Sequence, residues 1–298
     1  MYADLSLIRD YTPQDKLVWR PVVVNHFQRG GKSLYYINAR HVAEIDNPTC
    51  DTVREAIGVY KPQLVIIEGF PTECGVSPDF FIDYANREAT RNFADGESGY
   101  AAFLAHQNRI PFLGGEPLTI QICSVMEKEG YSAKDIMAFY LLRQIPQDRR
   151  EGKAMDEAHF AERALRYLPQ AFEHIPQQER LTLPEFEAWY AIHGSDGKHF
   201  LKTSADDLAP YASPVGNYFQ QLNHRLGLVR EQHLDTLIAE SLANSDRVLV
   251  VYGDGHLVQS RAVFEKMLGP GKSIALVKDQ VTYAGSGLSR RALDALTL

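Results

Sequence analysis

The sequence predicts an α/β fold with a mixed, largely parallel central sheet, flanked by helices and carrying a helical insertion or cap. Residues 248–252 are five consecutive apolar residues rich in Val, which is typical of a strand covered on both faces. Residues 64–67 form a second run of this kind. Residues 118–227 show helical patterns and no strand-like apolar run. We therefore expect an α/β core of residues 1–117 and 228–298, and a helical insertion or cap of residues 118–227.

The apolar periodicity places the expected elements in order along the chain. A hairpin joins strands at 20–27 and 33–38 through the Gly30-Gly31 loop. Further strands are expected at 63–71, 109–117, 248–252 and 273–277. Residues 78–108 have helical spacing that the polar residues 95–99 interrupt. Other helices are expected at 51–60, 136–145, 158–168, from 183 onward, at 230–243, at 258–268 and after residue 287, with a polar loop over 194–214.

Composition excludes several classes of protein. The chain has 298 residues, of which 45% are hydrophobic and 23% charged, as in an ordinary globular protein. A net charge of -7 disfavours non-specific binding to nucleic acid or to anionic membranes. The N-terminus lacks a signal-peptide pattern, and no apolar run approaches the roughly 20 residues that span a bilayer. Three widely spaced cysteines without a CxxC pair indicate reduced thiols, so a cytoplasmic location is expected.

Four ionisable side chains each follow an apolar strand. They are His41, Glu68, Glu116 and His256, and they would converge if their strands are parallel neighbours. Two imidazoles with carboxylates suit a divalent metal ion such as Mn, Co, Zn or Fe, with positions left for water. A metal-activated water and a spare glutamate would give hydrolysis. The simpler alternative is that each polar residue only ends a strand or caps the next helix.

The same stretches resemble a known superfamily. Residues 35–42 (YYINARHV), 65–68 (VIIE), Arg230 and residues 250–257 (VVYGDGHL) are similar to the TraB/PrgY/GumN and Tiki superfamily of metal-dependent proteases or hydrolases. That superfamily carries two Gly-x-x-His motifs and a glutamate, and is distantly related to erythromycin esterases and haem-binding ChaN-like proteins. The second motif matches at 253–256, whereas the first has Asn38 in place of glycine. Asparagine is one of the residues that tolerate a positive φ there.

The resemblance implies roles for particular residues. His41 and His256 would bind the metal, Glu68 would be a ligand or a base, and Arg230 would steady a carboxylate or an oxyanion. Glu116, from its strand end, and Glu44, three residues after His41, are further candidates.

Two alternatives to a metal-dependent peptidase, amidase or esterase stay open. One is a haem- or iron-binding protein of the ChaN-like type. The other is a metal-independent, erythromycin-esterase-like hydrolase in which His41 acts as base beside Glu68. The expected partners are a small-molecule or peptide substrate and a second copy of the chain in a homodimer, with no nucleic acid and no membrane.

Overall fold

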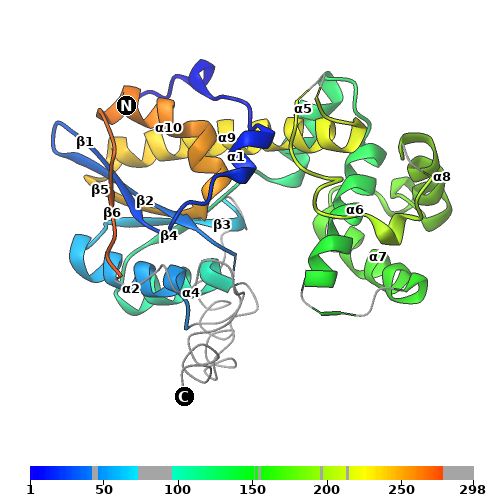
Figure 1. The fold of residues 1–298 in the computed structure, drawn as a ribbon, viewed down its shortest axis with the longest axis horizontal. Helices are drawn as coiled ribbons and strands as arrows, with labels where there is room; N and C mark the ends of the chain where they lie inside the picture. Colours follow the sequence, from blue (N-terminus) through cyan, green and yellow to red (C-terminus); the bar gives the residue numbers. More distant parts are fainter. Residues whose placement is uncertain are drawn as a thin grey trace. The chain divides into compact units, whose positions relative to one another are not determined.

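The computed structural model confirms the α/β class (Figure 1). It describes residues 1–41, 46–72, 96–150, 152–153, 156–194, 197–212 and 215–277. The described chain divides into an α/β unit, of residues 1–9, 14–117 and 231–298, and a helical unit, of residues 10–13 and 118–230. Each unit is described by itself below.

The α/β unit is built on one six-stranded sheet. Its strands are β1 Val24–Arg29, β2 Lys32–Ala39, β3 Leu64–Pro71, β4 Phe112–Glu116, β5 Arg247–Gly253 and β6 Lys272–Ile274. The order across the sheet is β4-β3-β5-β2-β1-β6. Strands β4, β3, β5 and β2 are parallel neighbours, whereas β1 runs antiparallel to both β2 and β6. The sheet is therefore mixed and largely parallel.

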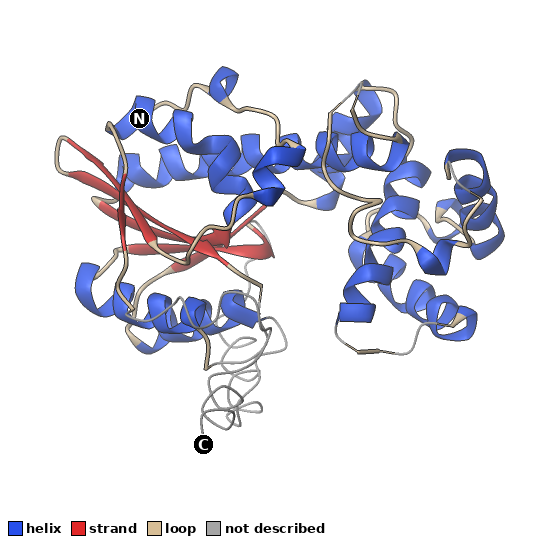
Figure 2. Cartoon of the chain, viewed as in Figure 1, coloured by secondary structure: helices blue, strands red, loops and turns tan. Residues whose placement is uncertain are grey.

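Helices cover both faces of this sheet (Figure 2). They are η1 Leu5–Leu7, α1 Pro13–Leu17, α2 Pro48–Tyr60, α4 Gly96–Gln107, the C-terminal part of α9 Tyr218–Asn244, and α10 Asp254–Leu268. Because successive strand residues point to opposite faces, Val250 packs with Ile238 of α9 and Phe264 of α10, and Val251 packs with Val53 of α2 and Ala102 of α4. The central strands are buried on both sides, as their apolar runs predicted.

The helical unit has its own apolar core. Its elements are α5 Thr119–Lys128, α6 Ala133–Arg150, α7 Glu157–Ala171, η2 Gln177–Glu179, α8 Leu183–His193, η3 Phe200–Lys202 and the N-terminal part of α9. Phe139, Phe160, Phe186 and Leu222 lie in this core and are almost fully buried. The core explains why helical spacing dominates residues 118–227.

Helices α4 and α9 and strand β6 are among the elements that differ from the sequence-based expectation. Helix α4 begins at Gly96, inside the polar stretch that we expected to interrupt it, because Glu97 and Ser98 are buried there. Helix α9 extends from Tyr218 to Asn244, far beyond the expected 230–243, because its N-terminal part packs in the helical unit. Strand β6 ends at Ile274. The expected helices before residue 96 and after residue 287 lie outside the described residues.

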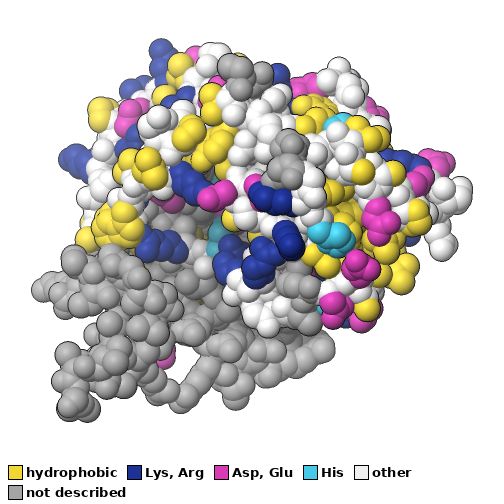
Figure 3. Space-filling view, turned by 45° about the vertical axis from the view of Figure 1, so that its right-hand side comes forward, with side chains coloured by type: hydrophobic (Ala, Val, Ile, Leu, Met, Phe, Trp, Pro, Cys, Tyr) yellow, Lys and Arg dark blue, Asp and Glu magenta, His cyan; other side chains and the backbone are white. Residues whose placement is uncertain are grey.

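The surface carries charges of both signs. The face in Figure 3 shows basic side chains in dark blue and acidic ones in magenta, with apolar side chains between them. None of the helices in the described part of the chain combines the length and the apolar character needed to cross a bilayer.

Candidate functional site

The carboxyl ends of four adjacent parallel strands form one edge of the sheet. Glu116 ends β4, Glu68 lies in β3, and His41 follows β2. Strand β5 lies between β3 and β2, and His256 is the third residue of the helix that follows it. Ligand sites of open α/β sheets lie at this edge. The strand order therefore places the four predicted residues at neighbouring strand ends.

Glu68 lies between the two predicted imidazoles. Its Oε1 is 3.3 Å from Nε2 of His256, and its Oε2 is 3.9 Å from Nε2 of His41. Oε2 also accepts a 2.7 Å hydrogen bond from the backbone N–H of Gly253. Glu68 is 8% exposed, so its charge is held in a largely desolvated position. These three side chains, far apart in the sequence, are the centre of the candidate site.

A second carboxylate holds the other nitrogen of His41. Nδ1 of His41 is 2.7 Å from Oε1 of Glu97. Glu97 is buried in the first turn of α4, where the helix dipole favours a negative charge. The hydrogen bond to Glu97, followed by the charge of Glu68, raises the pKa of His41 above its ordinary value.

His256 has the same arrangement with a carboxylate from α9. Its Nδ1 forms a short hydrogen bond with Oε1 of Glu231, which is fully buried. Glu231 also accepts hydrogen bonds of 3.1 Å from Gln259 Nε2 and 3.3 Å from Ser260 Oγ. Burial alone would lower the pKa of His256, but the carboxylates of Glu231 and Glu68 outweigh it and raise this pKa to about 10.

Gly253 leaves the space in which these groups meet. A Cβ atom at this position would lie 3.2 Å from Glu68 Oε2, 3.5 Å from His256 Cδ2 and 3.6 Å from His41 Nε2. Its backbone, with φ -56° and ψ 148°, is a conformation that any residue adopts. The first glycine of the GDGH motif therefore eases the close approach of these groups and is not needed for a special turn.

Asn38, which replaces the glycine of the first motif, does not need a positive φ. It lies in β2, and its backbone is not in the left-handed region. Its side-chain amide donates hydrogen bonds to the carbonyl of Pro21 (2.7 Å) and to Asp254 Oδ1 (3.4 Å). Its side-chain oxygen accepts a 2.9 Å hydrogen bond from the N–H of Val23. Asn38 thus ties β2 to the segment before β1 and to the start of α10. The tolerance of asparagine for a positive φ is therefore not used at this position.

The remaining predicted residues lie around this centre or outside the described chain. Glu116 accepts hydrogen bonds from Tyr252 Oη at 2.8 Å and from the N–H of Gly69 at 3.3 Å. Arg230 is the last residue of the helical unit and directly precedes Glu231 on α9. Its role at an oxyanion stays a prediction. Glu44 lies outside the described residues.

The sequence reasoning missed Glu97 and Glu231. The signal for Glu231 was present, since it precedes Leu234 and Ile238 by three and seven residues and so shares the apolar stripe of α9. An acidic residue in an apolar stripe indicates a buried partner. Glu97 was read as part of a polar interruption, and only the fold shows it under His41.

The side chains of this centre, imidazole and carboxylate, are of the types that bind divalent cations in proteins. In both imidazoles, Nδ1 is hydrogen-bonded to a buried carboxylate and Nε2 faces Glu68. Metal-binding histidines that are oriented by outer carboxylates have this pattern. The three buried carboxylates also carry more negative charge than two protonated imidazoles could balance. As they stand, no three His, Cys, Asp or Glu side chains of the described residues form a group that could hold a metal ion. The fit therefore lies in the type and orientation of the donors.

Comparisons of the chain with models of protein families, with curated proteins and with solved structures find no match.

Proposed function

We propose that the α/β unit is a metal-dependent hydrolase of the peptidase, amidase or esterase type, with His41, Glu68 and His256 as the residues that hold a divalent ion. One observation carries this proposal. Two histidines from different strand ends each have Nδ1 on a buried carboxylate and Nε2 toward one shared glutamate. A purely structural histidine pair has no need of this duplicated arrangement, whereas metal ligands use it to fix tautomer and ring orientation.

The negative charge of the cluster favours a bound cation over two imidazoles without one. Glu68, Glu97 and Glu231 are all buried, and a buried carboxylate needs a compensating charge. Both histidines have raised pKa values, so without a cation they supply that charge by taking up protons. A divalent ion would supply it with both rings neutral, which is the state in which imidazole binds metal.

The side chains have distinct roles in the proposed reaction. A bound divalent ion would acidify a water molecule and polarise the substrate carbonyl. Glu97 and Glu231 hold the two imidazole rings by Nδ1, so that Nε2 faces the reacting centre. Glu68 also accepts a hydrogen bond from the Gly253 N–H, and its carboxylate would serve either as a ligand of the ion or as the base that takes a proton from the attacking water and returns it to the leaving group. Glu116 binds Tyr252 and Gly69 in the same strand-end layer and remains a candidate for proton transfer.

The proposal is tested by metal content and by three variants. Protein purified without chelator is examined by elemental analysis, and hydrolysis of a peptide, amide and ester panel is measured before and after chelation. His41→Ala, Glu68→Gln and His256→Ala are each expected to lose bound Mn, Co, Zn or Fe and at least about 100-fold in rate.

The matched control is His233→Ala. His233 lies on the same helix as Glu231 and contacts Thr72 through Nε2 at 2.9 Å. This control should keep metal and rate. Full hydrolysis by chelated protein or by Glu68→Gln would contradict the metal-dependent mechanism, and a haem absorbance band without hydrolysis would favour the haem-binding alternative. We also propose a reducing, cytoplasmic compartment, because the three widely spaced cysteines without a CxxC pair are typical of reduced thiols.

A further inference from the structure

Arg40 follows the last residue of β2 and directly precedes His41 of the candidate centre in the chain. Its backbone is fixed to the start of α2, because its N–H donates a 3.2 Å hydrogen bond to Thr49 Oγ1. Its guanidinium is fixed as well, since Nη2 donates a 3.0 Å hydrogen bond to the carbonyl of Arg20. The guanidinium is thus hydrogen-bonded to one backbone carbonyl, that of Arg20.

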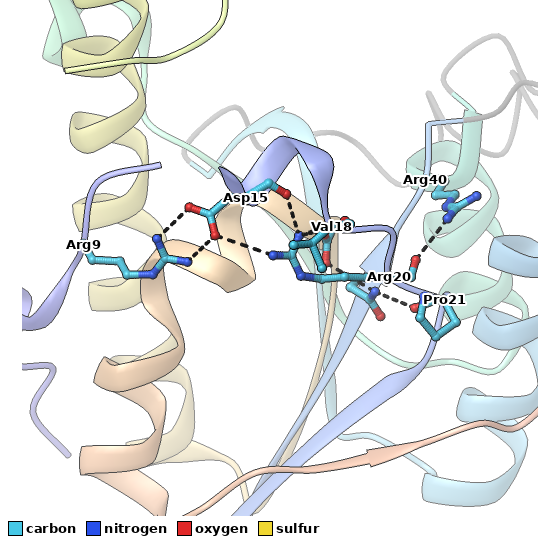
Figure 4. Close-up of polar contacts among 8 residues, drawn as sticks. Arg9, Asp15, Val18, Arg20, Pro21 and Arg40 are labelled. Carbon is cyan, nitrogen blue, oxygen red and sulfur yellow. Dashed lines mark hydrogen bonds and ion pairs between the residues drawn. The ribbon is translucent and has the colours of Figure 1, made fainter. Parts of the chain in front are cut away.

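The charge of Arg40 has no acidic partner among the described residues, in contrast to its neighbour Arg20. Figure 4 shows Asp15 between Arg9 and Arg20, and Arg40 turned toward the backbone of Arg20. The guanidinium of Arg20 is neutralised by Asp254 at 2.9 Å and by Asp15 at 3.6 Å. Among the described residues, the guanidinium of Arg40 contacts a carbonyl and an aromatic ring.

That ring belongs to Trp19, which is open to solvent. The guanidinium carbon of Arg40 lies 5.2 Å from the centroid of the Trp19 ring, and the Trp19 residue is 50% exposed. A guanidinium on an aromatic face keeps its outer N–H groups free for a planar acceptor. The indole beside it offers an apolar surface to the rest of the same ligand.

We propose that Arg40 and Trp19 form a subsite that binds a carboxylate group of the substrate next to His41. A fixed guanidinium with an unused edge matches the two oxygens of a carboxylate. The identification of this carboxylate with a substrate group rests on the proposed hydrolase function, whereas carboxylate binding itself does not. The substrate class that follows is an acyl compound that carries a free carboxylate beside an apolar group, such as a peptide with a free C-terminus.

The fluorescence of Trp19 allows a test without turnover. The chain contains two tryptophans, Trp19 and Trp189, so the difference between the wild type and Trp19→Phe isolates the Trp19 signal. N-acetylphenylalanine and its neutral amide are the two probes. We expect the acid to change this signal and to bind about tenfold or more tightly than the amide, because the ionised group gains charge-assisted hydrogen bonds. Arg40→Gln should abolish the preference, and Arg40→Lys should retain only part of it.

Arg261→Gln is the matched control. Arg261 also lies over an aromatic ring, at 5.7 Å from the centroid of Phe27, but it pairs with Glu265 at 3.5 Å. This variant should keep the full preference for the acid. Equal binding of acid and amide to the wild type, or an unchanged preference in Arg40→Gln, would overturn the subsite. The binding measurement needs no turnover. A protein that has no hydrolase activity but still prefers the acid would therefore refute the proposed hydrolase function and leave the subsite in place.

Discussion

Oε2 of Glu68 accepts a 2.7 Å hydrogen bond from the backbone N–H of Gly253, which joins β3 to the end of β5. The same oxygen is 3.9 Å from Nε2 of His41. The shared glutamate is therefore positioned by the main chain of the GDGH motif, and the space at Gly253 determines how closely the three groups approach.

Gly253→Ala should weaken metal binding and hydrolysis while the chain still folds. The added Cβ would lie 3.2 Å from Glu68 Oε2, but the backbone conformation is open to alanine, so we expect a loss of stability of at most about 2 kcal/mol. Elemental analysis and thermal unfolding measure the two effects. Gly58→Ala in α2 is the control, because nothing lies within 4 Å of its added Cβ; it should gain about 0.5–1 kcal/mol. Normal metal content in Gly253→Ala would refute the role of close approach.

Glu231→Gln should destabilise the metal-free protein in a pH-dependent way. Glu231 contributes to raising the pKa of His256 from 6.5 to about 10. A group with a raised pKa stabilises the folded state fully below its unfolded pKa, and this stabilisation is lost as the pH rises through the folded pKa. We expect a deficit of a few kcal/mol, on the order of 3, at pH 6 that shrinks toward pH 10. Urea unfolding at several pH values measures it, and a constant deficit would exclude the ion pair as its cause.

Asp235→Asn should stabilise the protein increasingly from about pH 4 to pH 8. Asp235 is fully buried on α9, and neither of its carboxylate oxygens makes a hydrogen bond among the described residues. Burial, with a contribution from the charge of Glu231, raises its pKa to about 8. Between its unfolded pKa of 3.8 and this value, only the unfolded chain releases the proton, so the wild type loses stability as the pH rises.

The amide of the Asp235→Asn variant cannot ionise, which removes this loss. Denaturant unfolding of the two proteins at pH 5 and pH 8 is the measurement. The advantage of the variant should reach a few kcal/mol, on the order of 3, at the higher pH. Parallel pH profiles for the wild type and Asp235→Asn would show that the carboxyl group does not stay protonated.

Glu97→Gln should weaken metal binding about 10- to 100-fold and lower the pKa of His41 toward its ordinary value. Glu97 holds Nδ1 of His41 at 2.7 Å and is the largest contributor to the raised pKa of that ring. Calorimetric metal titration measures the affinity, and proton NMR of the ring measures the pKa in metal-free protein. A His41 pKa that does not fall in Glu97→Gln would contradict the hydrogen bond.

The two readouts separate the local contact from the proposed function. A lowered His41 pKa without any change in metal affinity would confirm the contact between Glu97 and His41 but would contradict a role of Glu97 in metal binding. Asp51→Asn in α2 is a suitable control, since Asp51 pairs with Arg54 at 2.7 Å. It should leave the His41 pKa unchanged.

The sequence by itself determined the α/β class and placed four ionisable residues in the C-terminal half of a strand or shortly after its end, with Glu68 inside β3 and Glu116 as the last residue of β4. Apolar runs such as 248–252 predict buried parallel strands because a strand covered on both faces has no wet side. Parallel neighbours bring their carboxyl ends to one edge, and this alone predicted that His41, Glu68, Glu116 and His256 would lie at adjacent strand ends. These inferences use local periodicity, which a sequence displays directly.

Only the tertiary structure decided which side chains touch. Glu97 and Glu231 come from helices on opposite faces of the sheet, and their contacts with His41 and His256 depend on helix rotation and packing, which no local pattern specifies. The same packing leaves Arg40 without an acidic partner among the described residues while Arg20 has two. Strand ends are fixed by short-range hydrophobic patterning, whereas the charge around each imidazole is fixed by elements that are distant in the chain and meet only on folding.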